Sequence, residues 1–323
     1  MKRSFATGIV PTTWQAAQSA ACRFHKTRRN KYIMSETKKV PKRGLSTYCF
    51  YPMMDVNMDL EDIFIHMQDM GAVGLEILAD GIIENYPYPS NKWLDKWFAL
   101  VDRYGIVPVE YGHWVESRLV PGKEASVEEC LEQLIRDIKL ANFLGFTCMR
   151  TKLSVCDEIL TPVPNWREVI KRALPYAEKY NVVMQPEIHS PSKLTDKMIM
   201  DYVEFIEKEK TKYFGFNIDF GVFQDKEVEG MNRPRFMPLD PSKPEDIIPL
   251  LPYVHCCHAK YYNMSEDFEE TTIPYRKVID IMIEHGWDGY LLSEYEGPKK
   301  TDINHCITQV RRHQLFMKNI LGK

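Results

Sequence analysis

The chain has 323 residues, of which 44% are hydrophobic and 27% are charged, and this composition excludes a disordered or fibrous protein. Its 42 basic and 45 acidic residues give a formal net charge of −3. We therefore expect no nucleic-acid partner, because binding to a phosphate backbone needs clustered Lys and Arg. No membrane association is expected either, since no apolar run approaches the roughly 18 to 20 residues that span a bilayer.

The first segment differs in charge from the rest of the chain. Residues 1–35 contain no Asp or Glu, but they carry the basic residues Lys2, Arg3, Arg23, Lys26, Arg28, Arg29 and Lys31. This composition resembles an organellar transit peptide. We favour two alternatives, a disordered basic tail or a start codon upstream of a natural start at Met34. We predict a leader over 1–40 and a single catalytic domain over 41–323.

The cysteines indicate a reducing compartment. None of the eight cysteines forms a C-x-x-C pair, so neither a zinc knuckle nor a dithiol redox motif is expected. A chain of this size does not need disulfides to stabilise its core, and we therefore expect a cytoplasmic protein.

From residue 45 onward, short apolar or β-branched runs alternate with longer amphipathic runs. The predicted strands cover 45–50, 73–78, 106–111, 147–151, 182–188, 214–219, 254–258 and 289–294. The predicted helices lie near 58–70, 91–104, 126–144, 166–180, 195–210, 244–251, 274–285 and 302–319. Acidic residues from Asp59 to Asp62 suit the first turn of a helix. Gly71, Gly105, Gly145 and Gly286 suit the left-handed positions that end helices.

Eight strand–helix units over about 250 residues match the size of a (β/α)8 TIM barrel. The alternative is an open doubly wound sheet, but no G-x-G-x-x-G motif follows the first strand. Chemically capable residues also recur at the carboxyl ends of several strands, where barrel active sites are assembled. The predicted fold class is therefore α/β, a TIM barrel, with an insertion over 220–243 that would form a lid or a partner loop.

Each of the predicted strands five to eight ends in a residue that can bind a metal. These residues are Glu187, Asp219, His258 and Glu294, and they are 32, 39 and 36 positions apart, about one βα unit each. In a barrel all four would reach one rim. Three carboxylates and one imidazole suit Mn²⁺, Mg²⁺ or Co²⁺ better than a thiolate-binding metal. A bound dication would hold a substrate carbonyl and a neighbouring hydroxyl together and act as a Lewis acid that acidifies the adjacent C–H and stabilises an enediolate.

This succession, together with Gly74-Leu75-Glu76-Ile77 on strand two and His258-Ala259-Lys260 on strand seven, resembles the xylose isomerase-like TIM-barrel superfamily over about residues 45–320. That group contains sugar isomerases, ketose epimerases, inositol-pathway enzymes and endonuclease IV-type nucleases. The resemblance implies that the four residues are metal ligands, with Glu296 as the fallback for Glu294. It also implies that Glu187 and Glu294 move the proton, as the two ligand glutamates do in ketose epimerases.

The Glu187-x-His189 end of strand five resembles the large (α) subunit of bacterial C-glycoside deglycosidases. Those proteins are metal-dependent lyases that act on 3-oxo-glucosides of plant aglycones and work with a small β subunit. On this resemblance, His189 is the general base that takes the proton next to the oxo group. The alternative is that His189 supports a ligand or lies on a surface loop.

Further residues at the predicted rim are candidates for binding substrate. His113 and Trp114 follow strand three, and Trp114 would stack on a sugar or on an aromatic aglycone. Glu76 and Arg150 would bind hydroxyls or phosphate, or else form a buried structural pair. Lys260 would lie beside the metal and polarise the substrate carbonyl.

Four functions compete for this sequence. The first is a metal-dependent carbon–carbon lyase on oxo-glycosides that uses His189, and the second is a sugar isomerase or ketose 3-epimerase that uses Glu187 and Glu294. A nuclease of the endonuclease IV type is disfavoured, because Val222 stands where that family has a further histidine. The fourth is a barrel without activity that serves as an assembly subunit.

Overall fold

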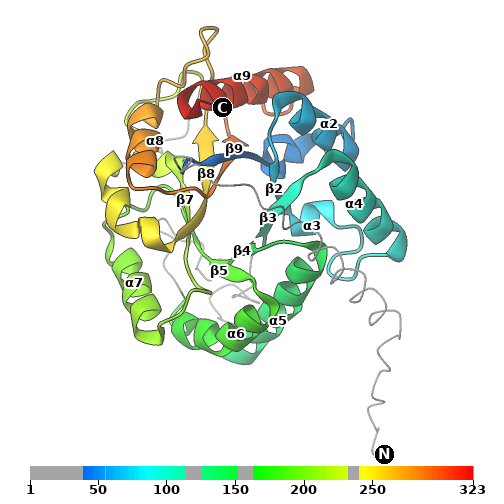
Figure 1. Ribbon diagram of the computed structural model, residues 1–323, viewed down its shortest axis with the longest axis vertical. Helices are drawn as coiled ribbons and strands as arrows, with labels where there is room; N and C mark the ends of the chain where they lie inside the picture. The colour runs from blue at the N-terminus through cyan, green and yellow to red at the C-terminus, as the bar shows by residue number, and fades with distance from the viewer. Residues whose placement is uncertain (1–38, 55, 114–124, 152–162, 232–239, 323) are drawn as a thin grey trace, which may run out of the picture. The chain divides into compact units, whose positions relative to one another are not determined.

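Nine parallel strands lie at the centre of the molecule and a ring of helices surrounds them (Figure 1). The computed structural model describes residues 39–54, 56–113, 125–151, 163–231 and 240–322. The strands are β1 (Lys42–Ser46), β2 (Gly74–Leu78), β3 (Val107–Gly112), β4 (Cys148–Arg150), β5 (Val183–Gln185), β6 (Glu187–Ile188), β7 (Phe216–Asp219), β8 (Val254–Tyr261) and β9 (Tyr290–Tyr295). Their order in the sheet is β5-β4-β3-β2-β1-β9-β8-β7-β6.

The two strands at the ends of this order, β5 and β6, are halves of one predicted strand. Pro186 divides them, because proline has no N–H to donate to the ladder. β5 pairs with β4, and β6 pairs with β7. On the edge of β5 that faces away from β4, Met184 exchanges backbone hydrogen bonds with the segment before β7. Its N–H donates to Tyr213 and its carbonyl accepts from Gly215, at 3.0 Å each. The strands therefore form a nearly closed barrel, which confirms the predicted (β/α)8 class.

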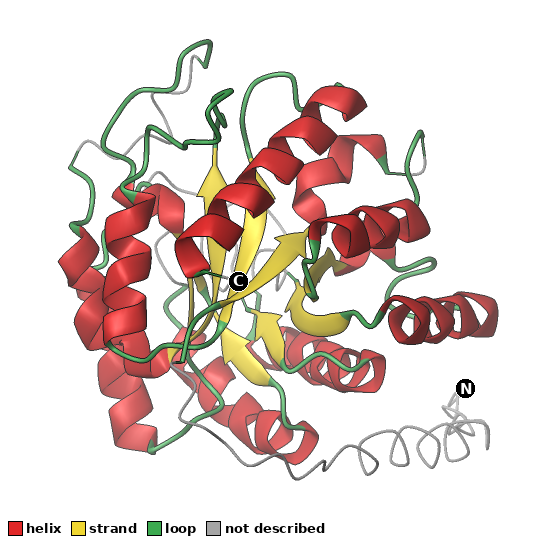
Figure 2. Ribbon diagram, turned by 45° about the horizontal axis from the view of Figure 1, so that its top comes forward, coloured by secondary structure: helices red, strands yellow, loops and turns green. Residues whose placement is uncertain are grey.

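Helices on the outside shield the barrel (Figure 2). They are α2 (Leu60–Met70), α3 (Ala79–Ile82), α4 (Asn91–Tyr104), α5 (Val127–Leu144), α6 (Trp166–Tyr180), α7 (Lys197–Glu209), α8 (Tyr275–Glu284) and α9 (Ile303–Leu321). Asp59 caps α2 in a reciprocal capping box with Asp62. Gly71, Gly105 and Gly145 end their helices with φ of +66°, +64° and +96°, as their spacing predicts. No helix among the described residues is long and apolar enough to cross a membrane.

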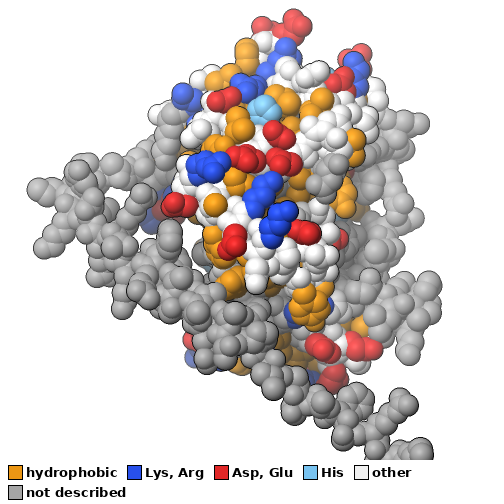
Figure 3. All heavy atoms as spheres, turned by 90° about the vertical axis from the view of Figure 1, so that its right-hand side faces the viewer, with side chains coloured by type: hydrophobic (Ala, Val, Ile, Leu, Met, Phe, Trp, Pro, Cys, Tyr) orange, Lys and Arg blue, Asp and Glu red, His pale blue; other side chains and the backbone are white. Residues whose placement is uncertain are grey.

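The outer surface over α2 and α4 carries acidic and basic side chains next to one another (Figure 3). Arg103 contacts Glu61 at 2.7 Å and links α4 to α2. Arg311 contacts Asp69 at 3.0 Å and links α9 to α2. Figure 1 shows α9 lying beside α2, so the last helix meets the first one and the helical ring closes.

Two predicted elements differ in kind from the observed ones. The predicted strand 45–50 stops at Ser46, whose hydroxyl accepts a hydrogen bond from the Tyr48 N–H and starts a 3₁₀ helix, η1 (Thr47–Met53). The predicted α-helix 244–251 is also a 3₁₀ helix, η3 (Pro244–Tyr253). Pro249 and Pro252 lie inside it, and each lacks the N–H that an α-helix needs.

The base of the barrel is filled by apolar side chains. Val109, Cys256 and Leu292 form a buried cluster with Tyr290 packed against it. Gly44 is needed beside them, because a Cβ there would come within 2.6 Å of Leu292 Cδ2. The buried polar residues of the barrel interior lie nearer the carboxyl ends of the strands than this apolar cluster does. The larger core lies between the strands and the helices.

Several predicted features fall on residues that the structure does not describe. Residues 1–38 of the predicted leader lie outside the described part of the chain. The predicted insertion 220–243 begins with a short 3₁₀ helix, η2 (Phe220–Phe223), and its residues 232–239 lie outside the described part.

Candidate metal centre

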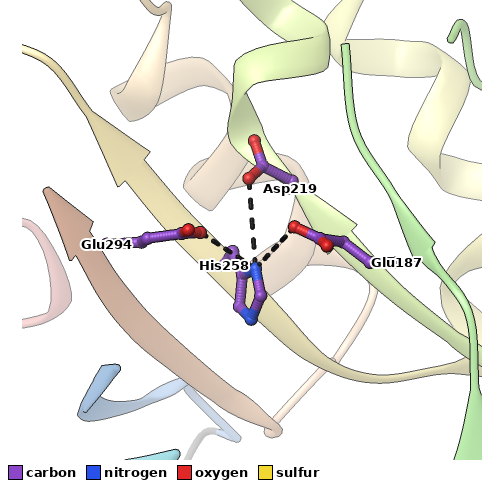
Figure 4. Close-up of side chains that lie close together, drawn as sticks. All are labelled: Glu187, Asp219, His258 and Glu294. Atoms are coloured by element: carbon purple, nitrogen blue, oxygen red, sulfur yellow. Dashed lines mark hydrogen bonds and ion pairs between the residues drawn. The ribbon is translucent and has the colours of Figure 1, made fainter. Parts of the chain in front are cut away.

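Three of the four predicted ligand residues, Glu187, Asp219 and Glu294, converge on Nδ1 of the fourth, His258 (Figure 4). Glu294 Oε2 lies 2.9 Å from this nitrogen, Glu187 Oε1 lies 3.0 Å from it and Asp219 Oδ2 lies 4.0 Å from it. One donor atom from each of the four residues lies within 4.8 Å of all the others. The residues come from β6, β7, β8 and β9, so four neighbouring strands supply the cluster.

This spacing fits a shared divalent ion. Ligand atoms that each lie about 2.0–2.2 Å from an ion, at right angles to one another, are about 3 Å apart. The side chains of Glu187, Asp219 and Glu294 are at most 6% exposed. Because grouping buried carboxylates is costly unless a cation neutralises them, a dication suits this site.

Strand register and one glycine position the acids. β7 and β8 pair Asp219 with His258, and β8 and β9 pair Lys260 with Glu294. Asp219 Oδ1 accepts a hydrogen bond from the N–H of Gly221 at 2.6 Å. A Cβ on Gly221 would come within 2.8 Å of that oxygen, so a larger residue there would push the Asp219 carboxylate aside. The other oxygen of Asp219 then faces the cluster.

Lys260 neutralises part of the charge. Its Nζ lies 2.8 Å from Asp219 Oδ2 and 2.9 Å from Glu296 Oε2. Glu296 also accepts a hydrogen bond from Tyr48 Oη at 3.2 Å, so the fallback ligand pairs with Lys260 and Tyr48 and lies outside the converging set of four.

Burial raises the pKa of Asp219 to about 7. Burial acts the same way on Glu294, but Lys260 and His258 outweigh it and hold that pKa well below its usual range.

The opposite edge of the His258 ring faces a second pair of acids. Its Nε2 lies 3.1 Å from Glu76 Oε2 and 3.2 Å from Glu110 Oε2. Both acids are fully buried, and burial raises the pKa of Glu76. Glu110 was not among the predicted site residues. The available signal is an acid within the otherwise apolar run Ile106–Tyr111 of strand three.

Arg150 joins the two acid groups. Its Nη1 lies 3.3 Å from Glu187 Oε2 and 3.9 Å from Glu76 Oε1. Burial lowers the pKa of the guanidinium, but the charges of Glu187 and Glu76 outweigh it and raise that pKa. The structure therefore brings Glu76, Arg150 and Lys260 together with the predicted metal ligands. Whether they bind substrate stays a prediction.

His189 follows the last residue of β6 and lies near Glu187. Its Nδ1 is 2.6 Å from the carbonyl oxygen of Ser190. A carbonyl only accepts hydrogen bonds, so Nδ1 carries the proton and Nε2 is the basic nitrogen of the neutral ring. Burial would raise the pKa of Glu187, but the charges of His189, His258 and Arg150 hold it well below its usual range.

His113 lies in a separate hydrogen-bonded cluster. Its Nδ1 is 3.1 Å from Tyr86 Oη and its Nε2 is 3.6 Å from Asp137 Oδ2. Tyr86 and Tyr111 both donate to Asp137, at 2.8 Å and 2.7 Å. Trp114 lies outside the described residues. A role for either residue in substrate binding stays a prediction.

One residue pair near the centre had no sequence signal. Lys300 Nζ lies 3.1 Å from the centre of the Tyr48 ring, and burial lowers its pKa to about 8. Tyr48 falls inside the predicted first strand, and Lys300 lies in the connection after β9. Only the folded chain brings them together.

The chain belongs to the xylose isomerase-like TIM barrel family, whose model matches residues 64–319. Among curated proteins, it is 23% identical to the 3'-dehydrocarminate deglycosidase alpha subunit of a Microbacterium species over 346 aligned positions, which cover 88% of this chain and 96% of the relative. It is 21% identical to a C-glycoside deglycosidase alpha subunit of Arthrobacter globiformis, with 77% of this chain and 82% of the relative covered.

Solved structures with the same fold include a ketose epimerase and a protein with a bound zinc atom. D-psicose 3-epimerase from Clostridium cellulolyticum H10 superposes with a TM-score of 0.63 at 13% identity, covering 87% of this chain and 99% of the other. The IOLI protein, which was solved with a bound zinc atom, superposes with a TM-score of 0.62 at 12% identity, covering 87% of this chain and 98% of the other. At these identities the likeness establishes the fold.

Proposed function

We propose that this protein is a divalent-metal-dependent enzyme that removes the proton next to a sugar carbonyl. The specific reaction that we propose is the cleavage of 3-oxo-C-glucosides of plant aglycones by β-elimination. The observation that carries the proposal is the convergence of Glu187, Asp219 and Glu294 on His258 Nδ1, with His189 two residues after Glu187. The deglycosidase names of the two relatives support the choice of substrate.

The same four side chains would hold the ion. Their oxygen-rich set favours Mn²⁺, with Mg²⁺ or Co²⁺ as alternatives. When bound, the ion supplies Lewis acidity at the substrate carbonyl. Arg150 and Lys260 would orient sugar hydroxyls and the carbonyl, because both cations lie among the ligand carboxylates.

His189 acts as the base. The Ser190 carbonyl holds the Nδ1 proton, so Nε2 accepts the proton from the carbon next to the oxo group. The electron pair of that C–H bond forms the enolate and then the new C=C bond. When the C=C bond forms, the bond from the adjacent sugar carbon to the aglycone breaks. The aglycone leaves with the electron pair of that broken bond and takes up a proton.

The proposed assembly includes a small β subunit, since the relatives are named alpha subunits. The proposed compartment is the cytoplasm. Cys49, Cys148, Cys256, Cys257 and Cys306 are buried free thiols, which suits a reducing environment.

The test is an assay of the purified protein, with any co-purifying small chain, on a 3-oxo-C-glucoside in the presence of Mn²⁺. We expect release of the aglycone, loss of release after chelation, and recovery when Mn²⁺ is restored. His189→Ala should lower the rate by about 10²- to 10⁴-fold, the usual contribution of a general base, while retaining Mn²⁺. A chelated protein that releases aglycone at the full rate would refute the proposal.

A ketose 3-epimerase is the second candidate. Figure 4 shows Glu187 and Glu294 on opposite sides of His258, where each could serve one face of a substrate. In that enzyme these two carboxylates move the proton, and His189→Ala leaves most activity intact. Epimerisation of a ketose without aglycone release, little affected by His189→Ala, would favour this candidate.

A further inference from the structure

The edge of the His258 ring that faces away from the proposed ion needs a proton acceptor. An imidazole that binds a metal through Nδ1 carries its proton on Nε2, and the partner of that proton sets the orientation of the ring. Two carboxylates lie there, Glu76 at 3.1 Å and Glu110 at 3.2 Å. All three side chains are fully buried, so no solvent competes for this proton.

The two carboxylates are held differently. Glu110 accepts hydrogen bonds from Gln185 Nε2 at Oε1 and from Asn217 Nδ2 at Oε2, each at 2.8 Å. Asn217 Oδ1 also accepts from the backbone N–H of His258 at 3.0 Å. By contrast, no other described residue donates a hydrogen bond to either oxygen of Glu76. Glu110 is therefore tied to both the ring and the backbone of His258.

We propose that Glu110 is the positioning residue that accepts the Nε2–H of His258 and holds Nδ1 toward the ion. The inference rests on the proposed metal centre and identifies a residue that sets its affinity. Gln185 and Asn217 fix the Glu110 carboxylate, and the carboxylate fixes the ring. Glu110 acts through His258 and does not touch the substrate.

The structure supplies a matched pair of substitutions. Glu110→Gln places an amide NH₂ either at Oε1, where Gln185 donates, or at Oε2, where Asn217 donates and which the ring faces. In both cases one of these contacts breaks, and the negative charge that the ring faces is lost. Glu76→Gln makes the same chemical change at the same burial and nearly the same distance from Nε2. At position 76, however, the described residues make no hydrogen bond to either carboxylate oxygen, so the new amide breaks none, and the nearest cation, Arg150, stays 3.9 Å away.

The experiment is calorimetric titration of MnCl₂ into chelator-treated full-length protein, with circular dichroism as the check on folding. We expect the wild type to bind one Mn²⁺ per chain. Glu110→Gln should weaken binding by about 10- to 100-fold, the usual effect of losing the outer partner of a histidine ligand. Glu76→Gln should weaken it much less. The visible absorption bands of bound Co²⁺, which report the ligand geometry, should change in Glu110→Gln and stay close to the wild-type bands in Glu76→Gln.

Wild-type affinity in folded Glu110→Gln would overturn the inference and leave the metal centre in place. Two Mn²⁺ ions per wild-type chain would overturn it as well, because Nε2 would then face an ion. A wild type that binds no divalent ion refutes the metal centre itself, and the inference with it. Should Glu110→Gln not fold, Gln185→Met removes one of the two supports of Glu110, and unchanged Mn²⁺ affinity in that variant overturns the inference.

Discussion

The barrel and its helical layer use buried acids in opposite ways. In the half formed by β6 to β9, Glu187, Asp219 and Glu294 point at one imidazole nitrogen and at one another. Between β3 and α5, Asp137 is equally buried, but it accepts hydrogen bonds from two tyrosines and from the guanidinium of Arg136. The acids of the first region converge without enough donors, and the acid of the second is surrounded by donors.

This difference distinguishes a candidate ion-binding site from a structural hydrogen-bond network. A buried carboxylate is stable when donors satisfy its oxygens. Asp137 meets that condition within the chain. The cluster around His258 meets it only in part, through Lys260 and Arg150. The negative charge on these carboxylates that Lys260 and Arg150 do not neutralise favours the binding of a cation. The saturation of hydrogen-bonding capacity, more than burial, therefore distinguishes the two regions.

The largest expected effect breaks the converging cluster. Asp219→Asn removes one ligand, and Mn²⁺ affinity should fall by more than about 100-fold, since outer partners alone contribute 10- to 100-fold. Thermal unfolding with chelator and with Mn²⁺ measures this. At Mn²⁺ near 100 times the wild-type Kd, binding stabilises the fold by about 2.7 kcal/mol, and the variant should lose that gain. Asp225→Asn, on an exposed residue just beyond η2, is the control that keeps it.

The next prediction breaks the saturated network. Asp137→Asn leaves the Tyr86, Tyr111 and Arg136 donors facing a neutral amide. Urea unfolding should show a loss of about 2 kcal/mol in the free energy of unfolding, the scale of a hydrogen bond to a charged group. Mn²⁺ affinity should match the wild type. A variant that loses Mn²⁺ binding at unchanged stability would place Asp137 in the metal centre.

A third prediction compares two fully buried histidines. His258 is ringed by carboxylates, whereas His313 stacks on Tyr261 and bonds Ser293, and burial lowers its pKa to about 3. Below pH 6.5 the unfolded chain protonates this group and the folded chain does not. The free energy of unfolding should therefore decrease as the pH is lowered, and at pH 5.5 His313 should account for a loss of about 1.4 kcal/mol relative to neutral pH. His313→Phe should remove that part of the loss between pH 7.5 and 5.5, and an identical loss in the variant would contradict the assignment.

The smallest expected effect concerns an acid that caps a helix with one oxygen and pairs with Lys96 through the other. Asp59 caps α2, and Asp59→Ala should lower the free energy of unfolding by about 1 kcal/mol, the usual value of an N-cap. Denaturant titration measures the change, with Mn²⁺ affinity as the second readout. A change in Mn²⁺ affinity would show that α2 is coupled to the metal centre.

The sequence by itself predicted the barrel and the convergence of four side chains that could bind a metal. Glu187, Asp219, His258 and Glu294 recur at about one βα unit each, and the carboxyl ends of parallel strands meet at one rim, so spacing alone predicted their convergence. Alternation along a strand also placed His189 on the side of Glu187. The family match and the geometry agree with these predictions as far as fold and clustering are concerned.

Only the tertiary structure decided which residues complete the surroundings. Glu110 reaches His258 across the barrel, Lys300 lies on Tyr48, and His113 bonds Tyr86 and Asp137. The period of a strand tells which residues share a face, but barrel closure decides which faces meet and at what height. Contacts between residues close in sequence follow from local periodicity. Contacts between distant residues follow from how all the strands of the barrel are tilted and packed together.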